Sequence, residues 1–161
     1  MTSDELIRRF ELLPHPEGGF YRETYRAQDQ FTTPQGERNC STAIYFLLPA
    51  GAQSSLHRLK SDELWHFYLG DPLQIVEIHP DGRVLKTVLG RDIASGQNLQ
   101  HIVPAGVWFG SFPLTEHGYS FVGCTVAPGF DFADFEMAVR GELLNEFPHA
   151  QECIERLTVK S

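Results

Sequence analysis

Side chains that can transfer protons or bind metals concentrate in one short stretch of the sequence, which holds His57, Glu63 and His66. Imidazole and carboxylate groups at this spacing suit general acid–base catalysis or the coordination of a divalent cation. Strand alternation places Trp65 and Phe67 on the same face as Glu63. The same alternation turns His66 to the opposite face unless a β-bulge reverses it. We therefore expect His57 and Glu63 to share an interior site.

A second candidate lies near the start of the sequence, where Glu17 precedes Gly18 and Gly19. The two glycines predict a tight turn at which larger side chains would clash. In the simplest interpretation, Glu17 caps this turn or pairs with Arg22. The alternative places the Glu17 carboxylate at the mouth of an interior cavity, where it would contact a ligand.

Large aromatic side chains are the third kind of candidate. Most of them are expected in the core, but an aromatic-lined pocket also suits a flat or sugar-like ligand, so one or two are expected to touch it. The residues considered are Trp65, Phe67, Trp108, Phe109 and Phe121.

Composition and charge exclude several classes of protein. The 161 residues are 42% hydrophobic and 21% charged, which is ordinary for a globular domain. The formal net charge is −8, with no basic run to neutralise phosphates, so neither a nucleic-acid polymer nor an anionic membrane is an expected partner. The N-terminal residues lack the apolar region of a signal peptide, and no stretch is apolar enough to cross a bilayer. Three widely spaced cysteines suggest reduced thiols and a cytoplasmic location.

The elements that must position these residues are mostly short strands. A helix is predicted over residues 3–13, a set of strands from about 20 to 139, and a C-terminal helical segment over 141–157. Turn residues recur about every ten positions, which favours an antiparallel sandwich or barrel in one domain, residues 1–161. The predicted strands span residues 20–27, 41–49, 53–59, 63–69, 73–79, 84–89, 98–103, 107–112, 119–127 and 134–139.

Two stretches resemble the motifs of the cupin superfamily. In the first, Gly51, His57, Glu63 and Gly70 fall in register. The segment that starts at Pro104 is similar to the second motif. Three further motifs, HPEGGF, ELWHFYLGDPL and VAPGFDF, identify the chain as a member of one cupin-like family of unknown function, over roughly residues 3–145. The resemblance implies an antiparallel jelly-roll β-barrel with short terminal helices and a small molecule held inside.

The same resemblance bears on metal binding. Metal-binding cupins hold a divalent ion with three histidines and one glutamate, but here Leu59 and Phe109 stand at two of the histidine positions. Neither side chain has a lone pair to donate. We therefore expect no tightly bound metal or other cofactor. If an ion were bound, His57 and Glu63 would be its ligands, with His66 as a possible replacement.

The sequence leaves two functions open. One is a binding protein for a sugar- or nucleotide-like molecule, contacted by a set of residues drawn from the candidates above: His57, Glu63, Trp65, Phe67, Trp108, Phe121 and Glu17. The alternative is suggested by some cupin-fold epimerases, which need no metal. There His57 would act as the acid/base, with Tyr119 or Tyr45 as the opposing acid. A structural role like that of storage cupins fits less well, because those are longer and usually have two barrels.

Strand 119–127 predicts an assembly. It carries apolar residues on both faces, whereas one barrel has only one interior to bury them in. An outer apolar face needs a cover, and the short terminal helices can shield only part of it. We therefore expect a homodimer.

Overall fold

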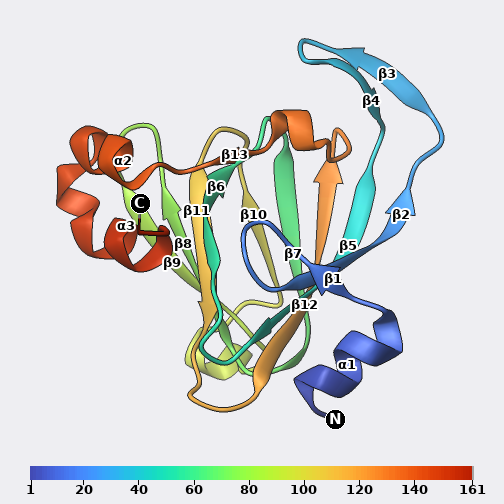
Figure 1. Cartoon of the computed structure of the whole chain (residues 1–161), viewed down its shortest axis with the longest axis vertical. Helices are drawn as coiled ribbons and strands as arrows, with labels where there is room; N and C mark the ends of the chain where they lie inside the picture. The colour runs from blue at the N-terminus through green and yellow to red at the C-terminus, as the bar shows by residue number, and fades with distance from the viewer. Residues whose placement is uncertain (161) are drawn as a thin grey trace.

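The structure, a computed structural model, describes residues 1–160. Most of its strands form two facing sheets, with one helix near the N-terminus and two at the C-terminal end (Figure 1). The first sheet has the order β1-β2-β5-β12-β7-β10 and the second β13-β6-β11-β8-β9. All pairs of named strands are antiparallel. No helix within the described residues is long and apolar enough to span a bilayer.

Each predicted run contains a strand, most of them differing only at their ends, and β1, β3 and β4 were not predicted. The first sheet contains β1 (Leu13–Pro14), β2 (Phe20–Arg26), β5 (Thr42–Pro49), β7 (Asp62–Gly70), β10 (Gln100–Val103) and β12 (Tyr119–Ala127). The second contains β6 (Ser54–Arg58), β8 (Leu73–Ile78), β9 (Val84–Leu89), β11 (Trp108–Pro113) and β13 (Glu136–Met137). The expected strand 134–139 is reduced to β13, because residues 132–134 form a 3-10 turn.

Large apolar side chains from both sheets fill the space between them. Phe46 of the first sheet and Phe109 of the second are fully buried. Trp65 meets both rings edge-on, with centroids 6.0 and 6.2 Å away. Such interdigitation across facing antiparallel sheets is the jelly-roll arrangement, so the predicted fold class is confirmed.

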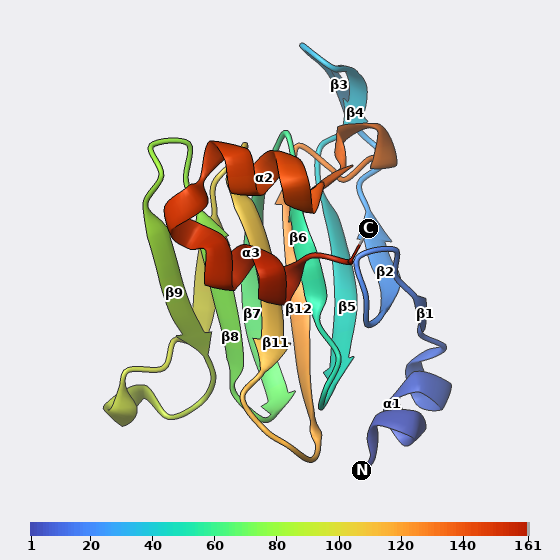
Figure 2. The ribbon, with the colours of Figure 1, turned by 60° about the vertical axis from the view of Figure 1, so that its left-hand side comes forward.

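The two C-terminal helices, α2 (Arg140–Glu146) and α3 (Gln151–Leu157), lie across the outer face of the second sheet (Figure 2). Ile154 and Leu157 are fully buried there, in one apolar cluster with Leu56 and Trp108. The predicted helical segment 141–157 is therefore present, interrupted by a 3-10 turn that starts at Pro148.

The N-terminal helix, α1 (Ser3–Phe10), is shorter than the predicted 3–13. Its expected capping box is present, with the Glu5 backbone N–H donating to Thr2 Oγ1 at 3.2 Å. The helix ends because Glu11 takes a left-handed conformation with φ of 51°. Pro14, expected to end the helix, lies in β1 instead.

A hairpin formed by β3 (Gln30–Thr33) and β4 (Gly36–Asn39) projects from one end of the sandwich (Figure 1). Its strands pair only with each other. The sequence did not predict this arm, because its residues are mostly polar and exposed and therefore show no apolar alternation.

The outer face of the first sheet is only partly covered. Helix α1 packs over Leu47 and Phe121 at one end of this face. Farther along, Tyr68 and Ile102 are 49% and 55% exposed. His66 also faces this side, where its Nε2 lies 3.0 Å from Thr125 Oγ1.

Candidate functional site

A cavity of about 440 Å³ opens at the end of the sandwich from which the arm projects. Its walls come from the loop between β1 and β2, from strands of both sheets, and from the segment 130–135. The lining residues are His15, Glu17, Tyr21, Glu23, Arg26, Thr42, Ile44, His57, Leu59, Glu63, Cys124, Val126, Phe130, Asp131, Phe132 and Phe135. Of the predicted site residues, His57, Glu63 and Glu17 are therefore brought together here.

The turn after Glu17 holds its carboxylate inside the cavity. Gly18 has a φ of 111°, and a Cβ at this position would lie 2.0 Å from the Gln53 carbonyl oxygen, so only glycine fits. The Glu17 carbonyl accepts a hydrogen bond from the Ser55 backbone N–H at 2.7 Å, which ties the turn to β6. Glu17 is only 7% exposed, so the interpretation that placed it in the cavity describes the structure.

His57 uses both ring nitrogens within the protein. Its Nδ1 lies 2.8 Å from the Ser55 carbonyl oxygen, which can only accept, so Nδ1 carries a proton. Its Nε2 lies 2.8 Å from Glu17 Oε2, and one proton joins these two atoms. Burial alone would lower the pKa of His57, but the Glu17 carboxylate outweighs it and raises that pKa. Burial opposes the charged form of Glu17 too, yet His57 holds the pKa of Glu17 below its ordinary value. The pair is thus an imidazolium and a carboxylate.

Glu63 has the opposite tendency. It is 7% exposed, and burial followed by the negative charge of Glu17 raises its pKa from 4.5 to about 7. The Cys124 thiol is its hydrogen-bond partner. Burial, and then the charge of Glu63, raises the pKa of Cys124 well above its usual value, so this cysteine is a neutral thiol. Near neutral pH, Glu63 is therefore a carboxyl group that can either give or take a proton.

His15 adds a neutral imidazole. Its Nδ1 accepts a hydrogen bond from the Glu17 backbone N–H at 3.1 Å, which leaves the proton on Nε2. Burial, together with the positive charge of His57, lowers the pKa of His15 and keeps the ring neutral. The His15 side chain is 6% exposed, and within residues 1–160 its Nε2 has no hydrogen-bond acceptor. This N–H is a donor available to a ligand.

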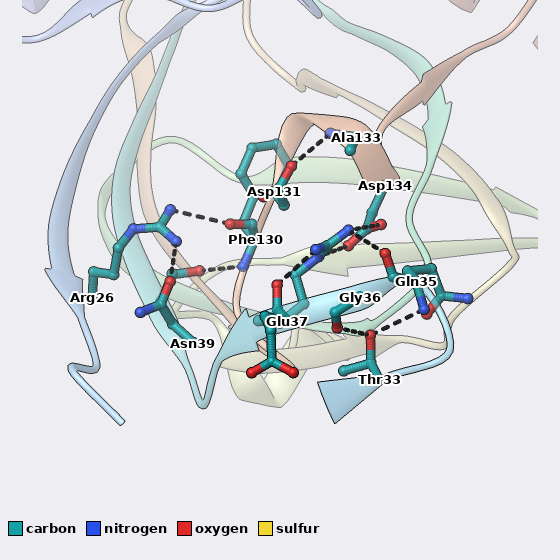
Figure 3. Close-up of polar contacts among 12 residues, drawn as sticks. Arg26, Thr33, Gln35, Gly36, Glu37, Asn39, Phe130, Asp131, Ala133 and Asp134 are labelled. Atoms are coloured by element: carbon teal, nitrogen blue, oxygen red, sulfur yellow. Dashed lines mark hydrogen bonds and ion pairs between the residues drawn. The ribbon is translucent and has the colours of Figure 1, made fainter. Parts of the chain in front are cut away.

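The rim of the cavity is held by charged pairs (Figure 3). Arg26 donates to both carboxylate oxygens of Glu23, to Asn39 Oδ1 at 2.8 Å and to the Phe130 carbonyl at 3.1 Å. Arg38 on the arm binds both oxygens of Asp134 at 2.8 and 2.9 Å. The arm thereby fixes the segment 130–135, which forms one wall.

Several predicted aromatic contacts lie elsewhere in the molecule. Trp65 and Phe67 do share the inner face of β7 with Glu63, but they pack in the core between the sheets and not on the cavity wall. Because Phe109 faces the interior, its neighbour Trp108 faces outward and packs beneath the C-terminal helices.

The two tyrosines suggested as acids also lie outside the cavity. Tyr119 and Tyr45 pack with Phe121 in the apolar cluster beneath α1, on the outer face of the first sheet. Alternation along β12 turns Tyr119 and Phe121 to that side together. The tyrosine that lines the cavity is Tyr21, which the sequence did not single out.

The positions of the two missing histidines are occupied by packed apolar groups. Leu59 is 5% exposed and lines the cavity, and the Phe109 ring lies 4.1 Å from the His57 ring, centroid to centroid. The His66 imidazole faces the other side of the sheet and cannot replace them. Within residues 1–160, no group of three or more His, Cys, Asp and Glu side chains is arranged to hold a metal ion. The donor set does not fit the metal centre of metal-binding cupins.

A jelly roll of two antiparallel sheets with a polar cavity between them is the architecture of a cupin. The family described as "Cupin superfamily (DUF985)" matches residues 4–138, most of the chain. This protein belongs to that family, as its three motifs predicted.

The names of three similar proteins state no activity. An uncharacterized protein of Saccharomyces cerevisiae is 31% identical over 144 residues, which cover 81% of this chain and 72% of that protein. A hypothetical protein from Leishmania major is 35% identical, with a TM-score of 0.95 and coverage of 99% of this chain and 100% of that one. A Shewanella oneidensis protein is 40% identical, with a TM-score of 0.93 and coverage of 100% and 99%.

A more distant likeness shows the fold alone. Oxalate decarboxylase from Bacillus subtilis is 18% identical, with a TM-score of 0.57 and coverage of 92% of this chain and 37% of that one. Function must therefore be argued from the cavity itself.

Proposed function

We propose that this protein binds a small polar molecule in the cavity between its sheets. The volume of about 440 Å³ lies in the usual range for small-molecule sites. Apolar and aromatic side chains share its walls with polar groups that converge on the interior. The sequence suggested a sugar- or nucleotide-like ligand, and hydrogen-bonding groups such as Tyr21 and the His15 Nε2–H suit a hydroxylated ring.

A second proposal is that the protein transfers a proton to and from the bound molecule without a metal. The observation that favours it is the pKa of about 7 for Glu63, because an acid–base catalyst works best near the ambient pH. The sequence suggested His57 for this role. With both of its nitrogens engaged, His57 is better placed as a positioning residue that orients Glu17.

The chemistry that fits is isomerisation or epimerisation beside a carbonyl. The Glu63 carboxylate would take a proton from the carbon next to the carbonyl, and the electron pair would move onto the carbonyl oxygen. The His15 Nε2–H or the Tyr21 hydroxyl would stabilise that oxygen by donating a hydrogen bond. For isomerisation, Glu63 would deliver this proton to the former carbonyl carbon while the proton of the neighbouring hydroxyl moves to the carbonyl oxygen, so an aldose and a ketose interconvert and no co-reactant is consumed. Epimerisation would instead need a proton donor on the opposite face of the carbon.

The test combines binding and proton exchange. Calorimetry with glucose, fructose, glucosamine, glucose 6-phosphate and UMP would show which class of molecule binds. NMR in D2O would then follow washout of the proton beside the carbonyl of fructose. We expect Glu63→Gln to abolish exchange while retaining binding, and Glu116→Gln, an exposed control, to change neither. Equal exchange by E63Q and the wild type would refute the catalytic proposal alone.

We also propose that the protein is a cytoplasmic homodimer. The three cysteines are unpaired, as expected for a reducing compartment. The exposed side chains Tyr68 and Ile102 on the outer face of the first sheet support pairing, because a second copy would bury them.

A further inference from the structure

The lining of the cavity is rich in carboxylates. Glu17, Glu23, Glu63 and Asp131 all contribute, whereas the fixed positive charges are those of Arg26 and the His57 imidazolium. His57 is neutralised by Glu17 at 2.8 Å. The positive charge that the cavity can offer to a ligand is therefore that of Arg26.

The Arg26 guanidinium already makes hydrogen bonds within the protein. Its Nε and one terminal nitrogen donate to the two oxygens of Glu23, which neutralises its charge. The other donations go to Asn39 and to the Phe130 carbonyl. A phosphate or carboxylate entering the cavity would have to displace Glu23, so the site is poorly suited to an anionic ligand.

Asp131, in contrast, retains an unpaired oxygen. Its Oδ1 accepts a hydrogen bond from the Ala133 backbone N–H at 2.8 Å, while Oδ2 has no hydrogen-bond donor within residues 1–160. Arg38 lies near, but it gives its bidentate contact to Asp134. Asp131 thus presents negative charge at the cavity wall.

Three phenylalanine rings line the same cavity as this carboxylate and pack against one another at steep angles. Phe130 and Phe132 meet at 83° with centroids 4.8 Å apart, and Phe135 meets them at 71° and 72°. All three line the cavity, and we call this aromatic part of its lining the cup. Aromatic faces beside a carboxylate are the surroundings in which proteins bind organic ammonium groups, through cation–π attraction.

We propose that the ligand is an organic cation that also bears oxygen, of the amino-sugar or amino-alcohol class. The ammonium group would sit in the cup of Phe130, Phe132 and Phe135 beside Asp131. The His15 ring lies 6.1 and 5.9 Å from those of Phe132 and Phe135, centroid to centroid, and its unpartnered Nε2–H, on a side chain 6% exposed, would donate to a hydroxyl or carbonyl oxygen. The net charge of −8 would attract such a molecule and repel polyanions. This inference rests on the proposed binding function and names its ligand class.

The test is a charge-matched calorimetric comparison on the intact chain. Glucosamine, glucose and glucose 6-phosphate share a ring but differ in charge, and choline is a cation without a ring. We expect glucosamine to bind on the order of tenfold more tightly than glucose, and glucose 6-phosphate more weakly than either. Asp131→Asn should abolish the preference for glucosamine over glucose.

Asp92→Asn is the matched control, because Asp92 caps a 3-10 turn in the same way as Asp131 but lies outside the cavity. It should behave as the wild type. Equal binding of glucose and glucosamine, preferential binding of glucose 6-phosphate, or no response to any amine would each overturn the inference. The first two outcomes would leave the binding function supported. That function fails only if neutral, cationic and anionic probes all fail to bind.

Discussion

Replacing Glu63 by glutamine should make the stability of the protein less sensitive to pH. The pKa of Glu63 is raised from 4.5 in the unfolded chain to about 7 in the folded protein, chiefly by burial. Between these values the folded state holds a proton that the unfolded state has lost, so stability falls as the pH rises. Each pH unit is worth about 1.4 kcal/mol, which gives a loss of about 3 kcal/mol that is complete above pH 7.

Glutamine keeps the size of the side chain and cannot ionise, so E63Q should escape this loss. Removing the Glu63 charge also removes one of the interactions that raise the pKa of His57, which makes 3 kcal/mol an upper value. Urea unfolding of both proteins from pH 4.5 to 8.5 measures the effect. The stability of E63Q relative to the wild type should rise across pH 4.5–7 and then level off. A constant difference at every pH would refute the reasoning, and Glu116→Gln should give a curve parallel to the wild type.

Two further predictions concern the backbone and the assembly. Gly18→Ala should destabilise the protein by about 1–3 kcal/mol or more, because its φ of 111° and the Gln53 carbonyl leave no room for a Cβ. Gly141→Ala, in α2 with nothing within 4 Å of the added atom, should instead be neutral or stabilising by up to about 1 kcal/mol, and urea unfolding that ranked the two alike would contradict this account. Sedimentation equilibrium at micromolar concentration should give twice the chain mass of 18.2 kDa, and Tyr68→Glu should shift the mass toward the monomer. A wild-type mass of one chain, unchanged on concentrating, would exclude the dimer.

The fold could be predicted because most strands have a buried face. Alternation and turn residues locate β5, β7 and β12, and period-two spacing correctly turns Glu63 toward the interior and His66 away from it. The arm formed by β3 and β4 escaped prediction because it packs against little and so needs no apolar pattern. A strand can be predicted from sequence where one of its faces is buried, because burial is what imposes the alternation of apolar residues.

The site could be predicted only in part. His57 and Glu63 follow from a strand pattern, but His15 and Asp131 reach the cavity from a turn and a loop, whose side-chain directions no periodicity fixes. Tyr21 lies on β2, where polar and apolar residues do not alternate clearly. Two sequence motifs contain residues of the site that strand periodicity did not locate. HPEGGF contains both His15 and Glu17, and VAPGFDF contains Phe130, Asp131 and Phe132. These motifs identified the family, and the structure shows that they also line its cavity.

The turn that carries Glu17 and the segment that ends at Phe135 lie near opposite ends of the sequence, yet they meet over the same cavity. Bringing them together closes a very long loop of chain. Such contacts form late in folding, because the conformational entropy of closing the loop is lost before the contacts contribute any stabilising energy. Strand pairs such as β8 with β9 and β7 with β10 are much closer in sequence and can form first. A kinetic consequence is that a folding chain passes through a stage with these strand pairs formed and its cavity still open. Pulse-labelled hydrogen exchange should then protect β8 and β9 before the Phe130 N–H, which donates to Thr42 Oγ1 across 88 residues.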